Sequence, residues 1–423
     1  MMKNFLKNNY GITDELYSIY ERALDKAQPY LNDIDKISDY NTAKVLRAFS
    51  DNRVSEEHLG TTTGYGYDDI GRDTLDKIYA QVFGAEDAIV RHNIVNGTAA
   101  IAACYFGVLR PGDTILAATG RPYDTLEEVI GIRGEGMGSL KEFGINYKEV
   151  SLKNNKVNFD ALKNAIDPSV KVVALQRSKG YSWRNSFSVD ELGEVISFVK
   201  SINKDIICIV DNCYGEFVET KEPTDVGADL IVGSLIKNPG GGLARCGGYI
   251  AGKKEYVELV SYRLTCPGIG RECGATLGNN RSMYQGFFMA PHIVAQSIKS
   301  GVLLSAVFDE MGFEVTPSYK DKRSDIITSV KLMKKENLLA FCRGIQSGSP
   351  IDSFVTPDPW DMPGYEDQVI MAAGAFTQGS SIEISADGPI RPPFVGYFQG
   401  GLTFESAKLP ILLAAKNVLE VEQ

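Results

Sequence analysis

Seven short apolar runs, rich in β-branched residues, constrain the fold of this chain more than any other feature. They cover residues 87–95, 114–118, 145–150, 171–175, 206–210, 229–233 and 247–251. Helical periodicity lies between the earlier runs, near residues 124–132, 158–166 and 188–200. Strands that alternate with helical crossovers form a mostly parallel sheet that helices cover on both faces. We therefore predict an α/β fold with a seven-stranded, mostly parallel sheet.

The length of 423 residues exceeds what a single hydrophobic core usually fills, so we expect more than one domain. The sequence predicts an N-terminal helical arm over residues 1–55, a large α/β domain over 56–300 and a small C-terminal α+β domain over 301–423. The elements expected in the small domain are strands at 313–316 and 380–385 and helices at 326–334 and 402–418.

Composition argues against several classes of function. The chain is 43% apolar and 23% charged, as ordinary soluble proteins are, and its formal net charge of −10 argues against a nucleic-acid partner. No apolar run reaches the roughly 20 residues that span a bilayer, so no membrane partner is expected. The seven cysteines lack paired spacing and only three histidines are present. We therefore predict reduced thiols, a cytoplasmic location and no metal site.

Two ionisable side chains follow neighbouring runs of the predicted sheet. Asp211 ends the run at 206–210, and Lys237 follows the run at 229–233 in a glycine-rich turn, with Ser234 three residues before it. Taken alone, each is more often a cap or a solvated loop residue. Together they lie at strand carboxyl ends, where α/β sheets bind ligands, and they are the Lys and Asp that a pyridoxal phosphate site needs. We expect burial to lower the pKa of the amine and leave it nucleophilic.

Further candidates open helices or follow strands. Gly97 and Thr98 begin a helix whose free N–H groups suit a phosphate, although a plain N-cap explains them equally well. Tyr123 can stack on a planar ring, but such a tyrosine more often packs at the edge of the core. Arg177 is a candidate contact for substrate or cofactor. Lys179 is a rival for Lys237, and it ranks lower because Lys237 has a serine three residues before it and follows Asp211 along the chain.

Four more residues lie outside this pattern. Tyr65, Tyr67 and Arg72 belong to a segment rich in Gly, Tyr and Asp, which forms either a packed surface loop or a loop that reaches a phosphate. Arg391 follows a predicted strand of the small domain. It either clamps an α-carboxylate with two hydrogen bonds or holds a loop by backbone contacts, and the sequence leaves both open.

A family resemblance is carried by four stretches: TTTGYGYDDIGRDTLDKIYAQVFGAEDAIVR, NGTAA, DNCYGEFVE and GSLIKNPGG. They resemble fold-type I pyridoxal phosphate enzymes, and most closely the methionine γ-lyase/cystathionine β-lyase-like family known as aluminium-resistance proteins. The resemblance covers nearly the whole chain. It implies Lys237 as the Schiff-base lysine and Asp211 as the partner of the pyridine nitrogen. The other implied cofactor contacts are Gly97, Thr98 and Ser234 at the phosphate and Tyr123 on the ring.

The resemblance also implies an assembly. In the related lyases a Tyr-x-Arg loop of a neighbouring subunit completes the phosphate site. Here the triplet is Tyr65-Gly66-Tyr67, without the arginine, and Arg72 is the candidate to replace it. We therefore expect a homodimer or homotetramer with active sites near the subunit interface.

The implied activity is that of a carbon–sulfur lyase acting through an internal aldimine on Lys237. It would remove a thiol from the β- or γ-carbon of a sulfur-containing amino acid and leave ammonia and a 2-oxo acid. Arg391 and Arg177 are the predicted substrate ligands. Two alternatives stay open: the same cofactor used for an aminotransferase, racemase or aldolase reaction, and a non-catalytic, stress-related protein that keeps the fold.

Overall fold

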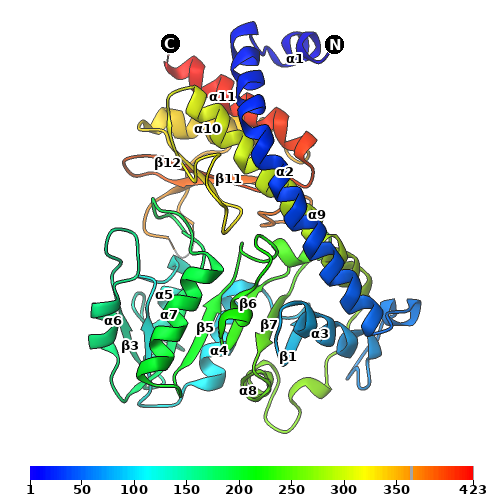
Figure 1. Ribbon diagram of the computed structural model, residues 1–423, viewed down its shortest axis with the longest axis vertical. Coiled ribbons are helices and arrows are strands. Elements are labelled where there is room, and N and C mark those ends of the chain that lie inside the picture. The colour runs from blue at the N-terminus through cyan, green and yellow to red at the C-terminus, as the bar shows by residue number, and fades with distance from the viewer. Residues whose placement is uncertain (363–364, 423) are drawn as a thin grey trace. The chain divides into compact units, whose positions relative to one another are not determined.

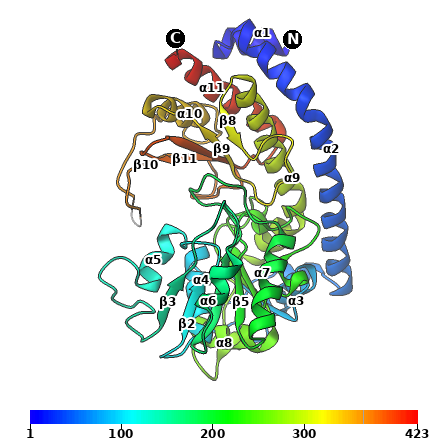
Figure 2. The same ribbon diagram turned by 60° about the vertical axis from the view of Figure 1, so that its left-hand side comes forward.

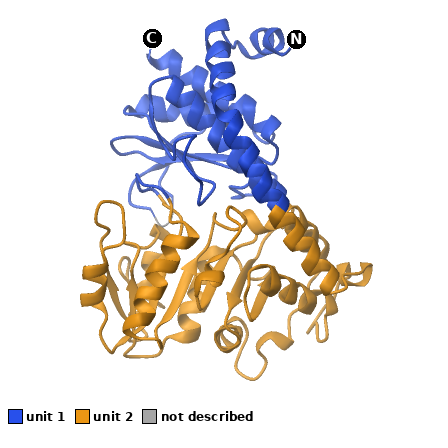
Figure 3. Ribbon diagram, in the orientation of Figure 1, with its two compact units in different colours: residues 1–39, 181–185, 291–423 blue, residues 40–180, 186–290 orange. Residues whose placement is uncertain are grey.

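The computed structural model describes residues 1–362 and 365–422 (Figure 1). The chain divides into two compact units (Figure 3). Unit 1 comprises residues 1–39, 181–185 and 291–423, and unit 2 comprises residues 40–180 and 186–290. Most of the expected large domain thus lies in unit 2. The expected arm over residues 1–55 is divided between the two units.

Unit 2 contains a seven-stranded sheet in the order β1-β7-β6-β5-β4-β2-β3. Its strands are β1 (Asp87–Arg91), β2 (Thr114–Ala117), β3 (Asn146–Glu149), β4 (Val170–Gln176), β5 (Ile207–Asp211), β6 (Leu230–Ser234) and β7 (Gly248–Gly252). All neighbours from β3 to β6 pair in parallel, whereas β7 is antiparallel to both β6 and β1. The predicted sheet is confirmed. Its order places β5, which ends in the candidate aspartate, beside β6, which precedes the candidate lysine.

The helices of unit 2 cover this sheet (Figure 2). They are α3 (Ile70–Val82), α4 (Gly97–Val108), α5 (Asp124–Ile130), α6 (Phe159–Ala165), α7 (Val189–Ile202) and α8 (Lys254–Leu264). Single 3-10 turns lie at Glu56–Leu59, Pro223–Val226, Asn238–Gly240 and Gly270–Glu272. Strands β2, β6 and β7 are buried along their whole length, which explains why they form continuous apolar runs. Polar caps set the helix starts: Asn96 accepts from the Ala99 N–H, and Ser188 forms a capping box with Glu191.

Unit 1 contains an antiparallel five-stranded sheet in the order β10-β11-β12-β9-β8. The strands are β8 (Glu314–Thr316), β9 (Thr328–Lys331), β10 (Val369–Ala372), β11 (Ser385–Pro389) and β12 (Val395–Gln399). Helices α10 (Lys335–Ser347) and α11 (Phe404–Glu422) pack against each other, and α1 (Met2–Tyr10) begins the chain. The expected α+β class of the C-terminal part is confirmed.

Two element predictions for this unit are wrong. The segment predicted as a helix over 326–334 contains strand β9, because its β-branched residues pair with β8 and β12. The segment predicted as a strand over 380–385 is mainly a turn, and β11 begins only at Ser385. In this turn Glu383 is buried, and its carboxylate accepts the N–H groups of Phe376 and Thr377 at 2.6 and 2.9 Å.

Two long helices contribute residues to both units: α2 (Asp14–Asp51) and α9 (Asn280–Glu310). Helix α9 is long and apolar enough to cross a membrane by length and composition. However, 72% of its most apolar window is buried within the protein, as in the core helix of a soluble domain.

Asp387 in β11 provides a test of the packing in unit 1. The residue is 8% exposed, and its Oδ1 has no hydrogen-bond partner in the part of the chain that the structure describes. Burial raises the pKa of this carboxyl group to about 7, against the opposing effect of a hydrogen bond with Tyr181. As pH rises above the ordinary pKa of an aspartate, the carboxyl group of Asp387 loses its proton in the unfolded chain but keeps it in the folded chain. Unfolding is therefore favoured increasingly up to a pH near the folded pKa.

We expect Asp387→Asn to remove this loss of stability at higher pH. Between pH 5 and pH 8 the free energy of unfolding of the wild type should fall by about 2–3 kcal/mol more than that of the variant. Denaturant unfolding at the two pH values measures the difference. Asp358→Asn is the matched control, because that side chain is 73% exposed. Equal pH dependence in wild type and Asp387→Asn would contradict the expectation.

Candidate functional site

Asp211 is the last residue of β5, and the backbone on both sides holds it in place. Its carbonyl accepts the Arg177 N–H at 3.1 Å, and the next N–H, of Asn212, donates to Val232 O of β6 at 3.0 Å. Its Oδ1 accepts the Cys213 N–H at 3.1 Å. Burial raises the pKa of the carboxyl group, whereas the charge of Lys237 and the Cys213 N–H lower it. The candidate carboxylate and the candidate amine are therefore close enough to interact electrostatically.

Lys237 follows β6 and precedes the 3-10 turn at Asn238–Gly240. Its Nζ lies 4.1 Å from the centre of the Tyr214 ring, which favours a cation. Burial lowers the pKa of the amine, but the acidic groups of Cys213, Tyr214, Asp211 and Glu216 outweigh burial and raise it overall. The expectation of a lowered pKa is therefore wrong for the protein without a ligand. The amine is an ammonium ion, and it must lose a proton before it can act as a nucleophile.

The turn between these two residues is strained. Tyr214 and Phe217 have φ angles of 72° and 62°, in the left-handed region that non-glycine residues rarely adopt. Such backbone persists only where the surroundings hold it, and it occurs preferentially at functional sites. Here the turn places the Tyr214 ring beside the amine of Lys237.

A candidate anion site lies at the N-terminus of α4. A Cβ atom on Gly97 would lie 3.3 Å from Cys213 Sγ and 3.5 Å from Ser234 Cβ, so the three residues meet closely. The Ser234 hydroxyl is buried, and it has no hydrogen-bond partner among the residues that the structure describes. The first N–H groups of α4, on Gly97 and Thr98, lack intrahelical acceptors. A buried hydroxyl without a partner, beside a helix N-terminus, suits a phosphate group.

Tyr123 lies at the same end of the sheet and precedes α5. Its N–H donates to Gln176 Oε1 at 2.9 Å, and Gln176 ends β4 directly opposite Asp211 in the sheet register. Two residues further on, the Thr125 hydroxyl lies 2.9 Å from the Thr98 hydroxyl. The aromatic ring thus belongs to a segment that is tied both to the strand end at Asp211 and to the helix start at Thr98.

These residues fit the cofactor that the sequence resemblance implies. A lysine amine, a carboxyl group, an aromatic ring and an anion site occur at one edge of the sheet of unit 2. The Ser234 hydroxyl is the observation that decides the fit, because a buried polar atom without a partner calls for a ligand. The rival lysine, Lys179, is only 1% exposed, whereas Lys237 is partly exposed. Accessibility therefore favours Lys237.

Arg177 does not point to a substrate. It is 0% exposed, and its Nη1 donates to Asn212 Oδ1 at 2.8 Å and to Gly215 O at 2.9 Å. Its Nη2 donates to Glu219 Oε1 at 2.7 Å. These contacts hold the turn after β5. We therefore revise the predicted substrate contact and assign Arg177 to the support of this turn.

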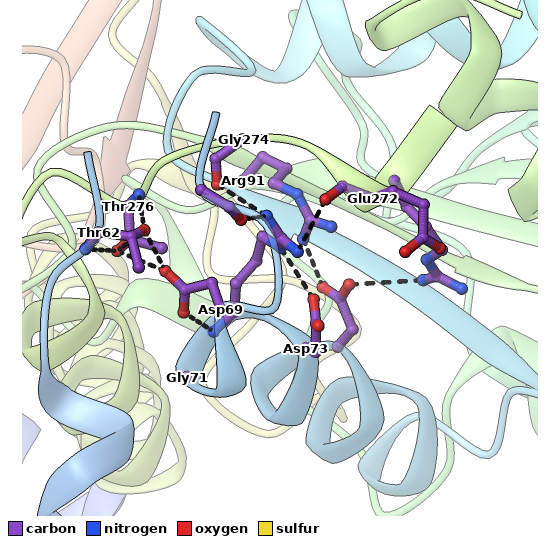
Figure 4. Close-up of polar contacts among 12 residues, drawn as sticks. Thr62, Asp69, Gly71, Asp73, Arg91, Glu272, Gly274 and Thr276 are labelled. Atoms are coloured by element: carbon purple, nitrogen blue, oxygen red, sulfur yellow. Dashed lines mark hydrogen bonds and ion pairs between the residues drawn. The ribbon is translucent and has the colours of Figure 1, made fainter. Parts of the chain in front are cut away.

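Arg72 is likewise buried, at 2% exposure. Figure 4 labels the nearby residues Asp69, Asp73, Gly274 and Thr276 and marks their polar contacts with dashed lines. Its Nη1 donates to Gly66 O at 2.6 Å and to Gly274 O at 2.9 Å, and its Nε pairs with Asp73 at 2.8 Å. Nearby, the Asp69 carboxylate accepts the Arg72 N–H at 2.8 Å and the Thr276 hydroxyl at 2.9 Å. Arg72 therefore ties two loops of unit 2 together, and the predicted phosphate contact has no support in this arrangement.

The loop that Arg72 holds carries Tyr65 and Tyr67. Their rings stack with centroids 5.5 Å apart and an interplanar angle of 18°. The two residues are 72% and 57% exposed, which is unusual for a stacked aromatic pair. The Gly274 N–H donates to Tyr65 O at 2.8 Å and so anchors the loop. The stacked pair is therefore exposed on the surface of the chain.

Arg391 belongs to unit 1, where its Nη1 lies 3.0 Å from Asp367 Oδ2 and half of its side chain, 51%, is exposed. Its predicted role at a carboxylate stays a prediction.

Sequence reasoning missed a set of buried polar side chains near Lys237. They are Asn212, Glu216, Glu222 and Tyr249, none of which is more than 1% exposed. A signal for Asn212 and Glu216 was present in the DNCYGEFVE stretch, where several polar residues directly follow a buried strand, whereas Glu222 and Tyr249 lie outside this stretch. The local sequence pattern did not indicate which of these side chains are buried.

Comparisons with known proteins show the family and the fold of this chain. A family model described as methionine gamma-lyase matches residues 16–419. The uncharacterized protein YnbB of Bacillus subtilis is 55% identical over 92% of each chain. Among solved structures, a carbon-sulfur lyase involved in aluminum resistance from Clostridium novyi is 55% identical, with a TM-score of 0.94 over 98% of each chain. The pyridoxal-5'-phosphate-dependent protein YhfS from Escherichia coli is 15% identical, with a TM-score of 0.61. The match covers 90% of this chain and 96% of YhfS, and it shows that the two proteins share the fold.

The Ser234 hydroxyl generates the first prediction for this site. In the ligand-free protein, Ser234→Ala should raise the free energy of unfolding by about 1 kcal/mol, because it removes a buried polar atom that has no partner. The same change should weaken binding of pyridoxal phosphate roughly tenfold or more, because a hydrogen bond to a charged group is lost. Denaturant unfolding and a binding titration measure the two effects.

Ser297→Ala is the matched control. Its hydroxyl is also buried without a partner in the described chain, but it lies in α9 within unit 1. It should stabilise the protein similarly and leave cofactor affinity unchanged. Unchanged affinity in Ser234→Ala would count against the anion site.

The second prediction concerns Arg177. Arg177→Met should lower the free energy of unfolding by about 3–5 kcal/mol, because it leaves buried acidic and amide groups without their donor. Arg121→Met is the control. This arginine is 51% exposed and pairs with Glu127, so its loss should cost no more than about 1 kcal/mol. If Arg177→Met kept full stability and only weakened substrate binding, the structural role would be wrong.

Proposed function

We propose that this chain, which belongs to the methionine gamma-lyase family, is a pyridoxal-phosphate-dependent carbon–sulfur lyase that acts on a sulfur-containing amino acid. The single observation that carries the proposal is the arrangement of Lys237, Asp211 and the unpartnered Ser234 hydroxyl at the carboxyl ends of β5 and β6. The likeness to the carbon-sulfur lyase of Clostridium novyi supports the choice of reaction.

The cofactor, when bound, supplies an electron sink that weakens the bonds to the α-carbon of an amino acid. We propose that Ser234 and the N–H groups of Gly97 and Thr98 hold its phosphate. The Tyr123 ring is proposed to pack on its ring. These residues fix position and exclude water, and none of them needs to change its protonation state.

Lys237 and Asp211 carry the proton chemistry in this proposal. The Asp211 carboxylate is proposed to keep a proton on the pyridine nitrogen, because a buried anion stabilises a cation beside it. Lys237 is proposed to attach the cofactor through its amine and afterwards to take the α-proton of the substrate as a general base. The Tyr214 ring holds the ammonium form of Lys237 at 4.1 Å and so keeps the side chain in a defined position.

The proposed overall reaction consumes one sulfur-containing amino acid and one water. It releases a thiol, ammonia and a 2-oxo acid, so that the carbon–sulfur bond breaks without any external oxidant or reductant. Both β- and γ-elimination satisfy this balance. Arg391 remains the candidate ligand of the substrate carboxylate.

The assembly is also a proposal. The exposed, stacked rings of Tyr65 and Tyr67 are suited to contact another subunit, because aromatic side chains are enriched at the buried cores of interfaces. We propose a homodimer or homotetramer in which this loop reaches a neighbouring phosphate site. A cytoplasmic location stays a prediction.

The purified protein should show a visible absorbance band after it is mixed with pyridoxal phosphate. Lys237→Ala should abolish this band, because the band requires a covalent bond to the amine. Lys179→Met is the control and should keep the band, provided that circular dichroism shows it to be folded. Loss of the band only in Lys179→Met would transfer the role to that lysine.

A screen of amino acids then identifies the reaction. We expect release of a thiol together with a 2-oxo acid from at least one sulfur-containing amino acid. A protein with an intact band that releases no thiol from any of them is not a carbon–sulfur lyase. Amino-group transfer or racemisation in the same screen would identify another reaction of the cofactor.

A further inference from the structure

A chain of buried polar side chains runs beside Lys237 and is not used by the proposed reaction. Arg177 Nη1 donates to Asn212 Oδ1 at 2.8 Å, and Asn212 Nδ2 donates to Glu222 Oε2 at 2.9 Å. Asn212 Nδ2 also lies 3.4 Å from the Tyr249 hydroxyl, which donates to Glu216 Oε1 at 2.8 Å. We call these five residues the buried polar chain. None is more than 1% exposed.

The two carboxyl groups of this chain have different partners. Glu222 lies 3.7 Å from the guanidinium of Arg177, and it accepts N–H groups from Asn212 and from the backbone of Phe217. Glu216 has no cationic donor of this kind: its Oε1 accepts the Tyr249 phenol, and its Oε2 has no hydrogen-bond partner among the described residues. A buried carboxylate that is held by neutral donors alone is costly, whereas a neutral carboxylic acid in the same place is not. The geometry at Glu216 therefore favours the protonated form.

Glu216 is fixed close to the candidate lysine. Its Oε1 packs on β6 where Gly233 has no side chain, and a Cβ atom there would lie 2.4 Å away. Its backbone oxygen accepts the side-chain N–H of Asn238 at 3.0 Å, and Asn238 directly follows Lys237. Both the strand residue before Ser234 and the residue after Lys237 are thus in contact with Glu216.

The groups that face Glu216 come from several elements. Burial raises the pKa of Glu216 to about 8, and the charge of Glu222 acts in the same direction. The backbone N–H of Glu216 itself, the Tyr249 hydrogen bond and the charge of Lys237 act against it. Tyr79 of α3, Tyr249 of β7 and Cys213 also interact electrostatically with Glu216. Lys237 is the cation within this set.

We infer that Glu216 is a positioning residue for Lys237: it is a neutral acid when the site works near neutrality, and on ionising it becomes a second anion that holds Lys237 in its charged form. This inference rests on the proposed function, in which Lys237 binds pyridoxal phosphate covalently. With Glu216 neutral, Asp211 is the one carboxylate that balances the cation. With Glu216 ionised, two carboxylates act on it, and the nitrogen of Lys237 keeps its proton to higher pH.

The test is a pH titration of the visible band of the pyridoxal-phosphate-loaded protein, from about pH 6 to about pH 10. The band changes as the nitrogen of Lys237 loses its proton. Glu216→Gln removes the second anion and keeps the shape, so the midpoint should move to lower pH by about one unit. Tyr249→Phe should move it in the same direction by less, because Glu216 without its hydrogen-bond donor ionises at higher pH.

Glu219→Gln is the matched control. It removes a different acid that binds Arg177 at 2.7 Å, and this acid is 25% exposed. Its midpoint should stay at the wild-type value. If Glu216→Gln also titrates like the wild type, the inference is overturned, although the proposed function stands.

A second measurement covers the case in which no band forms, which would refute the proposed function. The raised pKa means that folded Glu216 keeps its proton while the unfolded carboxyl has lost it, so stability falls as pH rises from about 4.5 to about 8. The melting temperature of ligand-free Glu216→Gln should therefore rise relative to that of the wild type as the pH increases from 5 to 8. A constant difference would mean that Glu216 is already ionised at low pH and would overturn the inference.

Discussion

The parallel pairing of β5 with β6 is the constraint on which the rest of this site depends. The pairing continues one residue beyond β5, where the Asn212 N–H donates to Val232 O at 3.0 Å. It brings Asp211 and the segment leading to Lys237 to one edge of the sheet. The strained turn that follows Asp211 is then held by the buried guanidinium of Arg177. The geometry needed for chemistry is thus built by groups that take no part in it.

Much of the fold could be predicted from the sequence because the large sheet is buried on both faces. Strands such as β6 therefore form uninterrupted apolar runs, which are visible without any partner. The small sheet could not be predicted in the same way. Strand β9 depends on pairing with β12, which lies far along the chain, and a short segment such as Thr328–Lys331 carries too little local signal to reveal it.

Some residues of the candidate site could likewise be predicted from the sequence, and others could not. The positions of Asp211, Ser234 and Lys237 followed from the general rule that strand carboxyl ends in α/β sheets meet at one edge. The inward orientation of the Arg177 and Arg72 side chains did not follow from this rule, because their hydrogen-bond acceptors come from other loops. The pKa of Lys237 was predicted in the wrong direction because burial alone was considered. The acidic groups that outweigh burial become neighbours only in the folded chain.

Gly233 constrains which substitutions relatives of this protein can accept at neighbouring positions. It pairs with Tyr249 across β6 and β7, and the glycine leaves the space that Glu216 and the Tyr249 ring fill. Any side chain at this position would collide with both. The three positions should therefore covary among relatives: a lineage that replaces the glycine must also shorten the acid and the aromatic residue, and a lineage that keeps all three inherits them as one unit.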